Sequence, residues 1–125
     1  MKAVTVTHDL KIGFTELDEP LYRSAGEYVG GHIEIVRPRG LNRPYVMIVN
    51  EEFLLLGLPK NLIGCYLYHT HIHGHTICGN FLIMKEQGED LVGLTDIETL
   101  QIMGAMAKVR DQIASAIQRK GMTTL

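Results

Sequence analysis

The feature that most constrains the fold is a long amphipathic helix, predicted over residues 94–120. Thr95-Asp96-Ile97-Glu98 fits a capping box, in which Thr95 and Glu98 each accept the other's backbone N–H. Apolar side chains then recur at spacings of three and four along one stripe: Ile102, Met106, Val109, Ile113 and Ile117. About 24 residues at 1.5 Å each extend roughly 36 Å, more than one small sheet needs. The stripe is therefore expected to form core and also to support self-association, for example in a homodimer.

Short β-prone segments with short connections precede this helix. Strands are predicted at 1–7, 11–17, 32–36, 45–49, 53–56, 76–85 and 90–94. A shorter helix is predicted after an N-cap at Asp18, with Glu19 and Pro20 in its first turn and Gly30-Gly31 at its end. Residues 62–68 fit either a helix or a strand. Without regular βαβ alternation, the pattern indicates an α+β fold: a mixed, mainly antiparallel sheet with one short and one long C-terminal helix, in a single domain of residues 1–125.

Composition excludes several classes of function. Twelve basic against fourteen acidic residues give a net charge of -2 with neutral histidines, whereas dedicated nucleic-acid binders are usually basic. No apolar run of about 18 residues indicates a membrane span, and no leader is recognised before Val4. The chain is therefore expected to be cytoplasmic, with Cys65 and Cys78 as free thiols.

Four of the six histidines alternate in the run His69-Thr70-His71-Ile72-His73-Gly74-His75. In an extended chain they would share one face but span about 20 Å, too far for four ligands to reach one ion. A fold at Gly74 could bring His71, His73 and His75 together around zinc or nickel, with a vacancy for water or a carboxylate. Two other interpretations stay open: a solvated polar loop and a contact surface that titrates.

Three arginines, Arg37, Arg39 and Arg43, occupy a loop rich in proline and glycine between two predicted strands. Guanidinium groups match carboxylates and phosphates with two parallel hydrogen bonds. This loop is therefore the best candidate for binding a small anionic ligand or an acidic partner protein. A solvated basic loop is the alternative, and no glycine-rich phosphate loop supports nucleotide binding, because Gly30-Gly31 leads from helix to strand.

Catalysis is not the leading hypothesis. Glu51 and Glu52 are adjacent, so on a strand their carboxylates would point to opposite faces. Cys65 lies in an apolar run, where a cysteine usually acts as a small hydrophobic residue rather than a nucleophile.

Five short segments occur in an order that resembles the domain-of-unknown-function family 3846. They are VGGHIEIV at 29–36, IVNEE at 48–52, GLPKN at 57–61, ICGN at 77–80 and GLTD at 93–96. The resemblance covers about residues 1–100 and does not include the histidine run. It implies a small intracellular accessory protein of a phage or mobile element, without catalytic residues to carry over.

Two classes of function follow. The first is a binding module that recognises a host protein or a small anionic ligand, for example one that antagonises a bacterial defence system. The second is a metal-binding protein or metal-dependent enzyme that uses the histidine run. Elemental analysis of untagged protein would distinguish these two classes.

Overall fold

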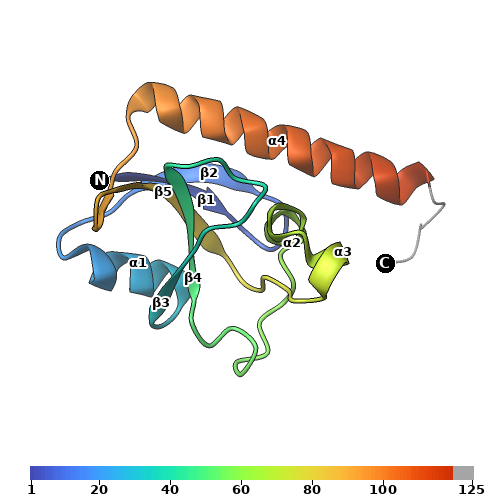
Figure 1. Cartoon of the computed structure of the whole chain (residues 1–125), viewed down its shortest axis with the longest axis horizontal. Helices are drawn as coiled ribbons and strands as arrows, with labels where there is room; N and C mark the ends of the chain where they lie inside the picture. The colour runs from blue at the N-terminus through green and yellow to red at the C-terminus, as the bar shows by residue number, and fades with distance from the viewer. Residues whose placement is uncertain (120–125) are drawn as a thin grey trace.

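The central strand of the sheet is β5 (Phe81–Gln87), which pairs with three other strands. The computed structural model describes residues 1–119 (Figure 1). All six strands pair antiparallel in the order β2-β1-β5-β4-β3, and β6 pairs with β5 beyond the end of β1. The other strands are β1 (Lys2–Val6), β2 (Ile12–Glu16), β3 (Ile33–Val36), β4 (Tyr45–Asn50) and β6 (Asp90–Val92). The predicted α+β class with a mainly antiparallel sheet is confirmed.

Helices cover both faces of this sheet. They are α1 (Leu21–Val29), α2 (Leu62–Tyr68), α3 (Thr70–His73) and α4 (Asp96–Arg119). Successive side chains of a strand point to opposite faces, so Phe81 and Ile83 of β5 enter the apolar cluster that includes residues of α2 and α4, whereas Leu82 and Met84 enter the cluster with α1. β5 is therefore apolar at consecutive positions, because both of its faces are buried.

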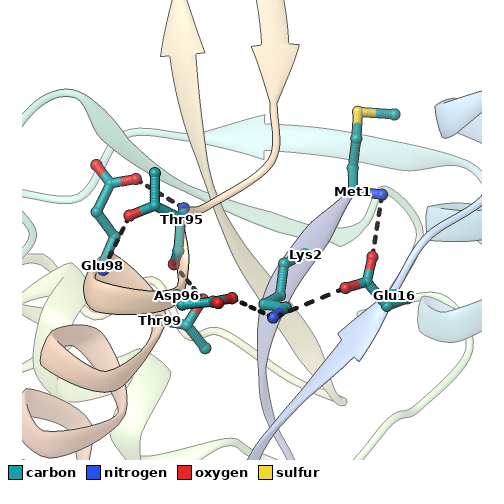
Figure 2. Close-up of polar contacts among 7 residues, drawn as sticks. All are labelled: Met1, Lys2, Glu16, Thr95, Asp96, Glu98 and Thr99. Atoms are coloured by element: carbon teal, nitrogen blue, oxygen red, sulfur yellow. Dashed lines mark hydrogen bonds and ion pairs between the residues drawn. The ribbon is translucent and has the colours of Figure 1, made fainter.

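The predicted capping box begins α4. The Thr95 N–H donates to Glu98 Oε1 at 2.9 Å, and the Glu98 N–H donates to Thr95 Oγ1 at 3.1 Å (Figure 2). Lys85 on β5 also reaches Glu98 Oε1 at 2.8 Å. The Lys85 ammonium and then the Thr95 N–H lower the pKa of Glu98 to about 2.

A second group of ion pairs holds the N-terminal strand beside this cap. The Lys2 ammonium pairs with Asp96 and lies 3.9 Å from Glu16, whose other oxygen is 3.3 Å from the Met1 amino group (Figure 2). The Leu94 N–H also donates to the Lys2 carbonyl at 2.8 Å. The start of α4 is thus fixed to β1 by backbone and side-chain contacts.

The apolar stripe of α4 packs on the core that the sheet and α2 share. Ile102 and Met106 are buried, and the partly buried Val109 and Ile113 contact the same cluster. The predicted helix at 94–120 is confirmed within the described residues, where it covers Asp96–Arg119, and residue 120 lies outside them.

Two local predictions are wrong. The short helix begins at Leu21 with Pro20 as its N-cap residue and no side-chain cap, rather than with Asp18 as the cap. The predicted return strand at 53–56 is instead part of a turn after β4. β3 and β5 already pair with the two edges of β4, so a returning strand would have no free edge to join.

Candidate functional site

The histidine run is helical rather than extended. His69 ends α2 in the left-handed conformation (φ 57°), residues 70–73 form the single turn of α3, and Gly74 ends that turn at φ 81°. These two left-handed residues bracket the turn, so the alternation of histidines does not place them on one face of a strand. The extended interpretation is therefore wrong.

Hydrogen bonds among residues 68–75 hold the histidine run together and indicate which ring nitrogen of His73 carries the proton. The His75 backbone N–H donates to His73 Nδ1 at 3.0 Å, so this nitrogen carries no proton. His73 Nε2 lies 2.8 Å from the Tyr68 carbonyl oxygen and donates its proton to it. The Thr70 hydroxyl also donates to the His75 carbonyl at 2.6 Å. Both ring nitrogens of His73 thus form hydrogen bonds to the backbone.

The predicted metal ligands do not form a group in this arrangement. The histidine rings lie in two pairs, with 5.8 Å between the centroids of His69 and His71 and 5.2 Å between those of His73 and His75. Within residues 1–119, no three histidine, cysteine or carboxylate side chains are grouped so that they could hold an ion. Binding of zinc or nickel by His71, His73 and His75 stays a prediction, and it would require His73 to give up a hydrogen bond.

The three predicted arginines separate into different environments. The Arg37 guanidinium pairs with Glu86 of β5 through two hydrogen bonds, one of them from Nε to Oε2 at 2.8 Å. Arg37 lowers the pKa of Glu86, first by this hydrogen bond and then by its charge, and the charge of Arg43 lowers it further. Arg37 and Arg43 thus both stabilise the ionised carboxylate of Glu86.

Arg39 instead faces the histidine run. The arginine loop bends over the end of α2, where the Gly40 N–H donates to the Leu67 carbonyl at 2.9 Å and Leu41 is buried in the core. Arg39 is exposed, and it forms no ion pair with the residues that the structure describes.

The loop and the histidine run enclose one groove of about 350 Å³, which we call the arginine–histidine groove. It is lined by Arg37, Pro38, Arg39, Tyr68, His69, Ile72, His73 and His75. Two segments that are some thirty positions apart, each singled out from the sequence, therefore form one surface. Arg43 does not line this groove.

A second groove, of about 370 Å³, adjoins the first and shares Tyr68 and His75 with it. Its other lining residues are Glu34, Val36, Phe53, Leu54, Gly74, Thr76 and Ile77. Leu54 and Leu55 of the adjacent turn are 70% and 84% exposed. Large exposed apolar side chains in one place are typical of contact surfaces, so the cationic groove continues into one of mixed character, in which Glu34 lies beside apolar side chains.

Two residues that build this site were not recognised from the sequence. A Cβ atom on Gly40 would lie 2.7 Å from the Leu67 carbonyl oxygen, so only glycine permits this close approach of loop to helix. Asn61, which is fully buried, caps α2 by accepting the Gly64 N–H at 3.0 Å. An asparagine directly before an apolar run is an N-cap signal, whereas nothing local marks Gly40.

No helix within residues 1–119 has the length and apolar character that a membrane span requires. No curated protein and no solved structure matches the chain. The family model described as Domain of unknown function (DUF3846) matches residues 1–105 of the 125. This match covers the whole sheet, both grooves and the first ten of the 24 residues of α4, and the protein belongs to this family.

Proposed function

We propose that the protein is a binding module that recognises an acidic partner protein through the arginine–histidine groove. The observation that carries this proposal is the convergence of residues 37–39 with residues 68–75 around one groove. The family resemblance implies a phage or mobile-element accessory protein, for which the partner would be a host protein such as a component of a bacterial defence system.

The chemistry of the groove favours an acidic partner. Arg39 offers an exposed guanidinium without a carboxylate among the described residues, and such a group pairs readily with carboxylates. Glu86 holds Arg37 in place through two hydrogen bonds, and the hydrogen bonds of His73 and Thr70 order the opposite wall. Side chains that are ordered before binding lose less conformational entropy when the partner arrives.

The apolar members of the groove favour a protein rather than an isolated anion. Ile72 is 71% exposed, and Tyr68 lines both grooves. Protein interfaces typically combine arginine and tyrosine with an apolar centre. A free anion would engage the guanidinium groups but would leave these apolar side chains uncovered.

A matched pair of arginine variants tests the proposal. The probe is a fluorescein-labelled peptide with leucines in one half and glutamates in the other, and a lysine–leucine peptide of the same layout is its charge-reversed control. We expect binding of the acidic peptide to weaken about tenfold or more in Arg39→Ala, because a hydrogen bond to a charged group contributes about 1.5–3 kcal/mol and about 1.4 kcal/mol corresponds to a tenfold change. Arg43→Ala removes a charge that is also exposed but lies outside the groove, and it should change the affinity less than about twofold.

The outcome is read from fluorescence anisotropy at fixed ionic strength, with melting temperatures measured in parallel. Both arginines are exposed, so both variants should melt close to the unmodified protein. The proposal fails if the acidic peptide does not bind, if the lysine–leucine peptide binds as tightly, or if the two variants weaken binding equally.

A further inference from the structure

One edge of the sheet is open beside these grooves. The His32 carbonyl accepts the Glu51 N–H at 2.8 Å, and Ile33 lies opposite Asn50 in the β3–β4 ladder. Backbone groups of alternate residues in an antiparallel ladder point to the partner strand. The backbone groups of Glu34 and Val36 thus face β4, whereas those of Ile33 and Ile35 face away from the sheet.

Nothing that the structure describes pairs with this outer side of β3. β3 is the last strand in the sheet order, and within residues 1–119 the Ile33 and Ile35 backbone groups have no hydrogen-bond partner. Figure 1 shows β3 at the margin of the sheet beside α1. An unpaired row of N–H and C=O groups is a template for a further strand.

The open edge continues directly into the two grooves. Glu34 and Val36 of β3 line the second groove, and Arg37 and Arg39 follow β3 along the chain and line the arginine–histidine groove. A strand placed beside β3 would pass along both. Every second side chain would face the grooves, where it would meet apolar side chains near Phe53, beside Glu34, at one end and Arg39 at the other.

We propose that the partner contributes an extended segment that adds to β3 as a further strand, with apolar side chains over the second groove and acidic ones beside Arg39. In strand addition, backbone hydrogen bonds supply affinity and pockets for alternate side chains supply specificity. Charge complementarity with Arg39 selects an acidic segment. This inference rests on the proposed function and specifies the form of its partner.

N-methylation of the glutamate–leucine peptide tests the backbone pairing. Successive N–H groups of a strand point in opposite directions, so methylation of every second residue blocks only one edge. Two peptides carry the methyl groups in the two alternate phases. We expect one phase to weaken binding at least tenfold and the other to change it less than about threefold.

A pair of proline variants tests the same pairing from the protein side. Ile35→Pro removes an N–H that faces outward, so it leaves the β3–β4 ladder bonds intact. Phe14→Pro is the matched control, because the Phe14 N–H faces outward at the opposite edge strand, β2, as the bond from the Leu17 N–H to the Met1 carbonyl shows. Only Ile35→Pro should abolish peptide binding, at temperatures where both variants are folded.

The outcomes separate this inference from the proposed function. If both methylated peptides bind like the parent while Arg39→Ala still weakens binding, the groove recognises its partner without strand addition. Equal losses in both methylation phases, or unchanged binding in Ile35→Pro, also overturn the inference. A dimer that Ile35→Pro dissociates, together with no peptide binding, would assign the edge to a second copy of the chain and refute a peptide partner.

Discussion

Asn61 is the residue whose replacement should most directly loosen the support of the histidine run. Its buried side chain donates to the Val6 carbonyl at 3.2 Å and to the Gly79 carbonyl at 3.0 Å, and it accepts the Gly64 N–H at the start of α2. It thus joins α2 to β1 and to the segment before β5. Asn61→Ala removes all three hydrogen bonds and leaves no polar atom in their place.

The cost of this substitution follows from these contacts. Loss of the cap costs about 1 kcal/mol, and each buried carbonyl that loses its donor adds about 1 kcal/mol or more. The free energy of unfolding should therefore fall by about 3 kcal/mol, which corresponds to roughly 12 °C in melting temperature at about 4 °C per kcal/mol. Urea denaturation at 25 °C measures this change, and the slope with denaturant should stay constant.

Asn80→Ala is the matched control for Asn61→Ala. The Asn80 side chain makes one exposed hydrogen bond, from the His8 N–H at 3.0 Å, so its loss should cost less than about 1 kcal/mol. If Asn61→Ala costs no more than Asn80→Ala, Asn61 does not support α2 in the way described.

Three further predictions concern the groove and α4. Gly40→Ala should lower the free energy of unfolding by about 1–3 kcal/mol and weaken peptide binding, because the added methyl group meets backbone atoms of α2. Gly104 has open space around it, so Gly104→Ala should stabilise α4 by about 0.5–1 kcal/mol in the same thermal melts. Glu98→Gln keeps an oxygen for the cap but loses the charge. Since the pKa of Glu98 is lowered from 4.5 to about 2, its contribution is present above pH 4.5 and is lost as the pH falls towards 2, so denaturation of the two proteins should differ most above pH 4.5 and converge below it. Ile113→Asp should cost about 2 kcal/mol against a few tenths for the exposed Ala114→Asp, and if the stripe also supports self-association, only Ile113→Asp should reduce the mass measured by light scattering.

The sequence predicted those parts of the fold that local patterns determine. The capping box at Thr95 and the apolar stripe of α4 depend on residues three and four positions apart, so both are visible without the rest of the chain. The prediction of a return strand at 53–56 is wrong, and no local pattern in the sequence shows why. Residues 53–56 form a short apolar run that is compatible with a strand, but both edges of β4 are already occupied.

The candidate site was predictable in its parts but not in its assembly. The arginine loop and the histidine run were recognised from their side chains, but their meeting depends on the bond from Gly40 to Leu67 between distant segments. The sequence also did not separate the three arginines, of which Arg39 lines the groove beside the histidines whereas Arg43 acts by its charge on Glu86. Spacing along the chain does not reveal which side of a loop each residue faces.

Chemical-shift mapping with the glutamate–leucine peptide tests the central claim most directly. In amide spectra of ¹⁵N-labelled protein, we expect the largest changes at Arg39, Tyr68, His69 and their neighbours around the arginine–histidine groove. Changes centred on α1, or spread evenly over the surface, would contradict recognition by this groove.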